Sequence, residues 1–140
     1  MTELEATQAI YAAIRAEFTS VVFTFEGERF TPPSDEAWIR VSIRDLTSRI
    51  SSLGQSGLSE RRGLLLAQCF APTFPDDGVA AALSLAHQFC RLFERTNKPD
   101  TAGADPAHFL VGSMTRVGVD GDWFQANASI PFFYLDTQTS

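Results

Sequence analysis

The sequence predicts an α+β domain in which two helices pack on a largely antiparallel or mixed sheet, and the sheet extends into a long mobile β-hairpin arm. Two segments, one at the N-terminus and one in the middle of the chain, repeat apolar residues at helical spacing. The other apolar segments alternate with polar residues or are rich in β-branched and aromatic side chains, as strands are. With 140 residues, 44% of them apolar, the chain can bury a core without metal or disulfide support, so one domain spanning residues 1–140 is expected.

The first predicted element is an amphipathic helix that begins after Thr2 and ends near Phe18. Thr2 suits the N-cap, and Glu5 three residues later completes a capping box. The apolar residues expected on the buried face are Leu4, Tyr11, Ile14 and Phe18. Residues 21–25 then predict a short strand, and two adjacent prolines within residues 31–35 predict an ordered loop.

The next segment predicts the two legs of the arm, which covers about residues 44–62. Residues 38–44 alternate strictly, which places Ile39, Val41 and Ile43 on a core face and the polar and basic residues on the other. Residues 46–58 are rich in serine and glycine and predict a mobile tip, after which residues 63–70 resume as a buried strand. Because long loops in compact domains are usually functional or disordered, the arm is the first place to expect a partner.

A second helix follows a turn that contains Asp76 and Asp77, which suit the helix N-terminus. Its apolar stripe is expected to be Val79, Ala82, Leu83, Ala86, Phe89, Cys90 and Phe93. Residues 97–99, Asn-Lys-Pro, stop the helix and lead into a polar linker.

The last predicted unit is a hairpin over about residues 109–134, turning at Asp120-Gly121 in a type I′ turn. The expected cross-strand pairs are Val117 with Phe124, Val111 with Ile130, Phe109 with Phe132, Arg116 with Gln125 and Met114 with Asn127. In this register Trp123 lies diagonal to Arg116 and can stack on its guanidinium.

The charge of the chain is unevenly distributed along it. The net charge is −6, yet residues 38–62 carry five arginines and two acidic residues, while residues 1–37 and 99–140 are both strongly acidic. The candidate binding residues are Arg40, Arg44, Arg49, Arg61 and Arg62. A basic segment between acidic ones can attract another copy of the chain or a polyanion. The alternative is a solvated strand face whose arginines point at water.

The common sequence motifs of catalytic, metal-binding and membrane-spanning segments are absent from the chain. It contains none of the common phosphate-binding, nucleophile-elbow or zinc-protease motifs. His87 and His108 lack partners at a metal-ligand spacing, Asp120-Gly121-Asp122 lacks the remaining ligands of a calcium loop, and Cys69 and Cys90 are interpreted as buried reduced thiols. No segment has the length of a membrane helix, and the acidic start is unlike a secretory signal. We therefore expect no enzyme activity, no cofactor, no metal and no membrane contact.

Several short motifs recur in a specific order along the chain. They are Phe30-Thr31-Pro32-Pro33, Trp38-Ile39-Arg40, Arg62-Gly63, Phe70-Ala71-Pro72, Gly78 with Ala86 and Phe93, Trp123-Phe124-Gln125 and Ile130-Pro131-Phe132. Together they resemble the tail terminator or tail completion (minor tail) proteins of long-tailed bacteriophages and prophages. The likeness spans about residues 10–134, with an acidic segment before Phe30 and a longer turn at residues 73–77 as departures from the family pattern.

This resemblance implies a structural virion protein whose copies form a hexameric ring. The ring would cap the finished tail tube at the head-proximal end of the tail and present the surface for head attachment, after assembly in the host cytoplasm. The implied partners are further copies of the chain, the tail tube protein and a head-completion or connector protein, with DNA crossing the lumen only transiently. The five arginines would then lie at a subunit or tail-tube interface or in the lumen.

Two alternative functions remain open from the sequence. The nearer is a head-to-tail connector or a tail tube subunit of a phage or prophage, which would share the fold class. The more distant is a small-ligand-binding domain that uses a pocket between helix and sheet.

Overall fold

The computed structural model describes residues 1–50, 58–73, 78–101, 103 and 105–137. In chain order its elements are α1 Glu3–Glu17, β1 Val22–Phe25, β2 Trp38–Ile50, β3 Leu58–Pro72, α2 Gly78–Phe93, β4 Asn97–Lys98, β5 Ala107–Phe109, β6 Ser113–Asp120 and β7 Trp123–Thr137. The predicted α+β class is confirmed. Neither of these two helices is long and apolar enough to cross a membrane.

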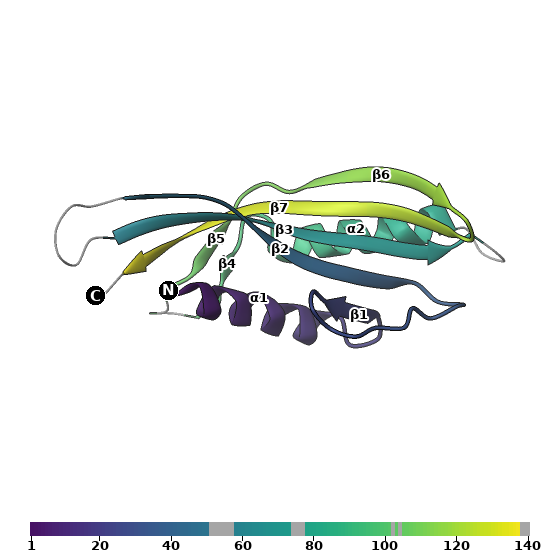
Figure 1. Ribbon diagram of the computed structural model, residues 1–140, viewed down its shortest axis with the longest axis horizontal. Helices are drawn as coiled ribbons and strands as arrows, with labels where there is room; N and C mark the ends of the chain where they lie inside the picture. Colours follow the sequence, from purple (N-terminus) through teal and green to yellow (C-terminus); the bar gives the residue numbers. More distant parts are fainter. Residues whose placement is uncertain (51–57, 74–77, 102, 104, 138–140) are drawn as a thin grey trace.

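One mixed sheet of seven strands forms the body of the molecule (Figure 1). Its strand order is β1-β2-β3-β7-β5-β4, and β6 pairs with β7 alongside the short β5. Only β1 and β2 run parallel; the other pairs are antiparallel. The most extensive strand pairings are those of β3, with β2 on one side and β7 on the other, so β3 is the central strand.

The first helix forms as predicted, and of its expected buried residues Ile14 and Phe18 are buried, Tyr11 is half-buried and Leu4 is exposed. Thr2 and Glu5 make the capping box: the Glu5 amide donates to Thr2 Oγ1 over 3.2 Å, and the Thr2 amide donates to Glu5 Oε1 over 3.0 Å. The prediction for Leu4 is wrong, because that side chain is 65% exposed. The buried side chains are Ala6, Ile10 and Ile14, which recur every four residues, whereas Leu4 lies off that stripe.

The core lies between both helices and one face of the sheet. Phe18 at the end of α1 stacks on Phe89 of α2 with 5.9 Å between ring centroids, which joins the two helices. The alternating residues Leu65, Ala67 and Cys69 of β3 are fully buried beneath them. The predicted stripe of α2 is confirmed at most positions, although Leu85 belongs to it and Val79 and Leu83 are only half-buried. Asp76 and Asp77 lie outside the described residues.

The predicted arm is not confirmed, and the two strands that were expected to form its legs are longer than expected and remain part of the sheet. Residues 46–58 were expected to form a polar tip, but β2 continues to Ile50 and β3 begins at Leu58, with Ile50 opposite Ser59. Polar residues persist in these strands because pairing satisfies their backbone groups: β3 continues to pair with β7 as far as Leu58 opposite Thr137. Residues 51–57, where the tip was predicted, lie outside the described residues.

The C-terminal hairpin forms, but its register differs from the prediction. The turn residues are Gly121 and Asp122, with Asp120 opposite Trp123, and the Asp122 carbonyl accepts a bond from the Thr73 amide over 2.9 Å. An irregularity between Arg116 and Gly118, where Gly118 has φ +116°, takes up a further residue. The observed pairs therefore include Val119 with Phe124, Gly118 with Gln125, Arg116 with Ala126 and Met114 with Ala128.

Of the expected hairpin pairs, Phe109 with Phe132 is confirmed. The expected pairs of Val117, Arg116 and Met114 are wrong, and Val111 lies outside the strands. Because the shifted register moves Arg116 away from Trp123, the expected stacking is also wrong. Trp123 instead meets Trp38 edge-on, with 6.3 Å between ring centroids.

Candidate functional site

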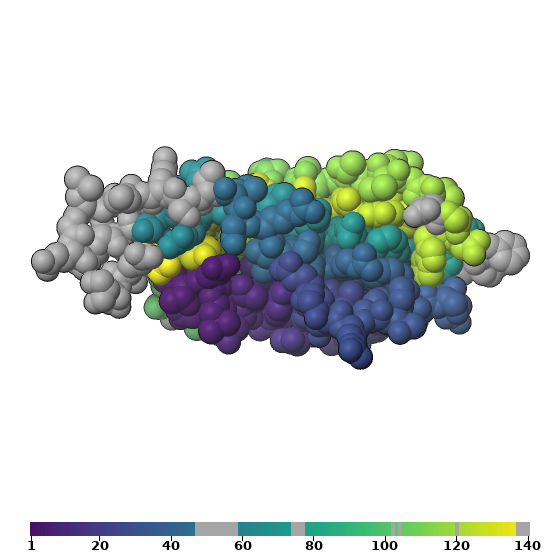
Figure 2. All heavy atoms as spheres, viewed as in Figure 1, coloured from purple at the N-terminus to yellow at the C-terminus, as the bar shows by residue number. Residues whose placement is uncertain are grey.

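The face of the sheet opposite the helices is uncovered along β2, β3 and β7. Figure 2 shows this face, with β6 along one border and α1 along the other. Strand alternation and the observed register define the surface, which we call the open face. Its residues are Arg40, Ser42, Arg44, Arg62, Leu64, Leu66, Gln68, Gln125, Asn127, Ser129 and Phe133. Most are polar, basic or half-buried apolar side chains.

An aromatic cluster closes one end of the open face and orients Arg40. Trp38 stacks on Phe70 with 4.3 Å between ring centroids, and Phe30 packs against it at 4.9 Å. The Arg40 guanidinium lies 5.2 Å from the Trp38 centroid and 5.9 Å from that of Phe70. Trp38 was predicted on the polar face and does lie there, but this cluster buries it, and its Nε1 has no hydrogen-bond partner among the described residues. The cluster presents the Arg40 charge outward.

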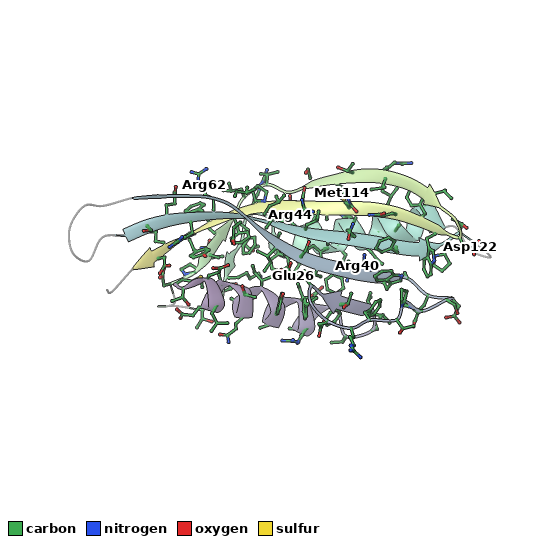
Figure 3. The ribbon with its side chains drawn as sticks, viewed as in Figure 1. Glu26, Arg40, Arg44, Arg62, Met114 and Asp122 are labelled. Atoms are coloured by element: carbon green, nitrogen blue, oxygen red, sulfur yellow. The ribbon has the colours of Figure 1, made fainter. Side chains whose placement is uncertain are left out.

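Arg44 and Arg62 continue the basic surface from Arg40 along the sheet (Figure 3). Arg44 is exposed on β2 and lies opposite Leu64, which places Arg62 diagonally across from it on β3. The Nε atom of Arg62 is 3.2 Å from Glu60 Oε2 in the same strand, so a carboxylate neutralises part of the charge there. Of these three arginines, Arg62 is therefore the one that has an ion pair within the described residues.

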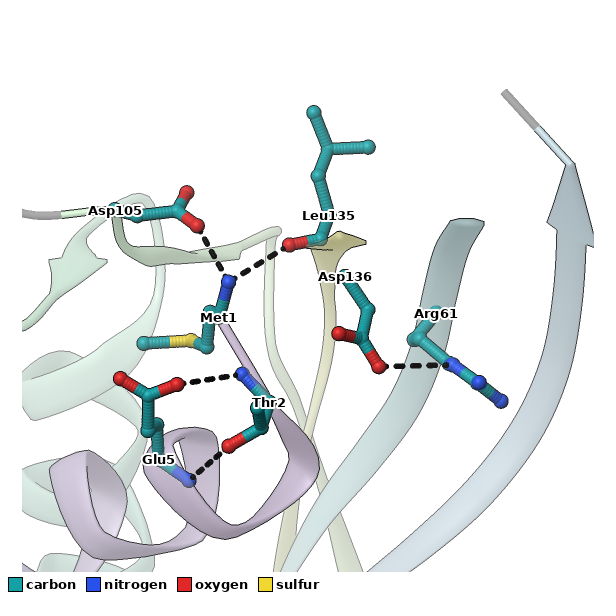
Figure 4. Close-up of polar contacts among 7 residues, drawn as sticks. All are labelled: Met1, Thr2, Glu5, Arg61, Asp105, Leu135 and Asp136. Carbon is teal, nitrogen blue, oxygen red and sulfur yellow. Dashed lines mark hydrogen bonds and ion pairs between the residues drawn. The ribbon is translucent and has the colours of Figure 1, made fainter. Parts of the chain in front are cut away.

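The structure does not bring all five candidate arginines together. Arg61 neighbours Arg62 in β3, so it points to the opposite, helix-covered face. There its Nε lies 3.6 Å from Asp136 Oδ2, close to the start of α1 (Figure 4). Arg49 lies opposite Glu60 in the register, and its side chain is outside the described part of the structure. The described candidates on one surface are thus Arg40, Arg44 and Arg62.

The N-terminus is held close to Arg61 by polar contacts. The Met1 ammonium group contacts Asp105 Oδ2 and the Leu135 carbonyl oxygen, the latter over 3.0 Å (Figure 4). The bond from the Thr2 amide lowers the pKa of Glu5 below its ordinary value. The Met1 contact with Leu135 ties the start of α1 to β7, next to the ion pair between Arg61 and Asp136.

Sequence analysis missed an apolar border of the molecule. Large exposed hydrophobic side chains gather in and just before β6: Leu110, Val111, Met114, Val117 and Val119. The expected register paired Val111 with Ile130 and Val117 with Phe124, so both valines were predicted to be buried and no exposed apolar border was predicted. The local signal was Gly118, whose positive φ marks the irregularity that shifts the strand.

Metal ligation and thiol reactivity are the two kinds of chemistry that the described residues allow us to assess. No group of three or more His, Cys, Asp or Glu side chains among them could hold a metal ion. Burial raises the pKa of the Cys69 thiol to about 12 and that of the Cys90 thiol to about 11. Cys90 Sγ lies 3.5 Å from Glu94 Oε2, and a bond from the Gly112 amide lowers the pKa of that carboxyl. Neither thiol is poised as a nucleophile.

Comparison with known proteins identifies the family and the fold of the chain. A family model described as "Phage tail terminator protein" matches residues 7–131. A solved structure superposes with a TM-score of 0.65 at 15% identity, covering 96% of this chain and 98% of the other, which shows a shared fold. No curated protein sequence matches the chain.

Proposed function

Because the chain belongs to the phage tail terminator family, we propose that it closes the end of the phage tail tube as a ring of identical subunits and offers the surface to which the head attaches. The observation that carries this proposal is the family match, which extends over most of the chain. Membership makes the protein a structural component of the virion tail that assembles with other tail and head proteins. What we propose beyond family membership is that the chain forms a ring, that the ring has six subunits and that it lies at the head-proximal end of the tail.

The charge distribution supports a ring. A closed ring of one chain needs heterologous contacts, in which one patch meets a different patch on the next copy. The acidic first 37 residues and the arginines of the open face give a single chain two unlike surfaces. Unlike charges on different surfaces favour association in one direction around a ring.

The direct test adds purified protein to tail tubes assembled without a terminator and images them by electron microscopy. The proposal predicts ring-shaped density at one end of each tube and restored joining to heads. Binding along the tube or polymerisation into tubes would instead identify a tube subunit, and binding to capsid portals would identify a connector. Either result would overturn the proposal.

We further propose that Arg40 and Arg44 contact the tail tube. Both project from the uncovered face, and Arg40 is held outward by the aromatic rings beneath it. The double substitution Arg40→Glu with Arg44→Glu should weaken tube capping by about tenfold or more, equivalent to about 1.4 kcal/mol of binding free energy. The loss should shrink as salt is raised, because salt screens exposed charges.

A matched control separates a local contact from a change of net charge. Arg29→Glu with Arg91→Glu adds the same charge at two exposed positions outside the open face and should leave capping unchanged. Normal capping by the Arg40/Arg44 double variant would contradict a tube contact. If DNA passage through the capped tube then changed, the arginines would belong to the lumen.

A further inference from the structure

The free edge of β6 is an apolar surface that the proposed tube contact leaves unused. β6 pairs with β7 only, and the described side chains along it are exposed or, at Gly118, half-buried. Val117 and Val119 are 55% and 66% exposed. Exposed strand edges of this kind are sites where another chain can add.

This edge has few of the features that usually prevent association, the irregularity between Arg116 and Gly118 being one of them. Arg116 is the only charged residue between Leu110 and Val119, and that segment contains no proline. The edge formed by β1 is better protected than the β6 edge. The β1 strand has only four residues, and its Phe25 amide donates a hydrogen bond to Glu28 Oε1 over 2.7 Å. The β6 edge is therefore longer and more exposed than the β1 edge, as expected of a surface that receives a partner.

The two remaining large exposed hydrophobic side chains of the described residues border the opposite edge of the sheet. Leu46, 56% exposed, lies in the irregularity between Asp45 and Thr47 of β2, beyond the part of that strand that pairs with β1. Leu4, 65% exposed, follows Glu3, and Glu3 and Asp45 line the same hollow between α1 and β2. We call Leu4, Leu46, Glu3, Glu26 and Asp45 the β2 border.

The β2 border is apolar and acidic, whereas the β6 edge from Leu110 to Val119 is largely apolar and carries one arginine, with Asp120 at the end of the strand. Glu3, Glu26 and Asp45 are all exposed. Glu26 Oε1 accepts a bond from the Ile43 amide over 3.2 Å, which fixes that carboxylate beside β2. The carboxyl groups of Glu3 and Asp45 also help burial to raise the pKa of Tyr134, so their negative charges converge near the hollow. An arginine from another chain would offset this local excess of negative charge.

We propose that the β6 edge of one copy packs against the β2 border of the next copy, with Arg116 facing the carboxylates of that border. The occupant is a second copy because both complementary surfaces belong to this chain. They lie at opposite edges of one sheet, so the contact is heterologous and repeats from copy to copy until a ring closes (Figures 1 and 3). This inference rests on the proposed ring and names its subunit interface.

The test uses one variant for each surface. Val117→Glu with Val119→Glu blocks the β6 edge, and Leu46→Glu blocks the β2 border. Each variant alone should remain a folded monomer by circular dichroism and light scattering and should fail to form rings on tubes. Ser84→Glu, at an exposed position of α2, is the control and should form rings as the wild type does.

Mixing the two blocked variants gives the decisive result. Each retains the surface that the other has lost, so a heterologous interface predicts dimers containing one copy of each and no larger ring. An interface in which β6 pairs with β6 of another copy would let the Leu46→Glu variant associate by itself, which would overturn the proposal. If glutamate impairs folding, Val117→Thr with Val119→Thr keeps the strand propensity and should weaken ring formation less severely.

A charge exchange tests the role of Arg116. Arg116→Asp should weaken ring formation about tenfold, and adding Asp45→Arg in the same chain should restore it, since each interface then regains an opposite pair. Glu3→Arg and Glu26→Arg are tested in the same way. If none of the three arginine substitutions restores ring formation to the Arg116→Asp variant, the proposed contact between Arg116 and these carboxylates is wrong.

The outcomes separate this inference from the proposed function. Wild-type protein that fails to form rings on tubes would refute the proposed function. Wild-type rings together with intact rings from the β6 variant would refute only this interface. Intact rings from the β6 variant that no longer bind tubes would show that the occupant of β6 is the tube protein.

Discussion

The two faces of the sheet, one covered by the helices and the other open, differ in composition and therefore in the role that each can have. The covered face consists almost entirely of apolar side chains under α1 and α2, and the aromatic contacts Phe18–Phe89 and Phe89–Phe93 run through it. The open face mixes arginines and amides with half-buried apolar residues and has no helix over it. The first face can account for the stability of the fold, which leaves the second available for binding.

The largest test of this division compares two phenylalanines. Phe89 is fully buried in α2, whereas Phe133 lies on the open face and stacks on His108 with 4.9 Å between ring centroids. Phe89→Ala should lower the free energy of unfolding by about 3–5 kcal/mol, since it leaves a cavity in the core. Phe133→Ala should cost about 1 kcal/mol, because less apolar area is lost from contact. Urea denaturation of both variants measures the difference, and equal losses would refute the division.

A smaller loss is expected at Gly63, where the covered face is too tight for a side chain. A Cβ atom there would lie 2.6 Å from Phe132 Cζ and 3.2 Å from the Arg44 carbonyl oxygen. Gly63→Ala should cost about 1–3 kcal/mol, because the Phe132 ring must move within a packed core. Combining it with Phe132→Leu should recover part of the loss, and thermal denaturation of the three variants tests this. A stabilised Gly63→Ala variant would show that the ring has room to move.

Sequence reasoning was most successful where one repeat and one local signal agreed. The Thr2–Glu5 capping box and the alternation of Ile39 and Val41 are local patterns, and the elements they predict are present. The C-terminal hairpin contains an irregularity for which Gly118 was the one local signal, and its turn is bonded to Thr73, which lies far away in the sequence. The expected register was two residues off beside the turn and one residue off before Gly118, where the error exchanged the faces and concealed the apolar β6 edge.

The candidate site was partly predictable for a similar reason. Arg40 and Arg44 lie in the alternating segment and were correctly placed on one face. Arg61 and Arg62 are adjacent, so in any strand they must point to opposite sides. Both arginines fall between the tip predicted for residues 46–58 and the strand predicted from residue 63, so the sequence pattern assigns neither of them to a face. Extended pairing of β3 with β7 made these positions regular.

A thiol buried in the covered face, that of Cys69, should make the folded protein less stable at alkaline pH. Burial raises the pKa of Cys69 to about 12, whereas an exposed thiol in the unfolded chain ionises near its ordinary value of 9.0. The unfolded state therefore loses its proton first, so the stabilisation is complete below pH 9 and is lost as pH rises from 9 towards 12. Cys69→Ala should flatten this decline, whatever its effect on stability at neutral pH. Unfolding free energies at several pH values test this, and an unchanged slope would contradict it.

The smallest predicted effects concern the open face itself and compare two arginines on one strand. Arg40 lies over Trp38 and Phe70, so Arg40→Gln should cost about 0.5–1 kcal/mol through loss of the cation–π contacts. Arg44 is exposed on the same face, and Arg44→Gln should change stability by less than about 0.5 kcal/mol. Urea denaturation resolves the two if the variants are measured in parallel. A larger loss at Arg44 than at Arg40 would mean that the aromatic cluster does not hold the Arg40 side chain. Near-neutral stability in both variants would leave any loss of tube capping attributable to the binding surface, because the covered face would still maintain the fold.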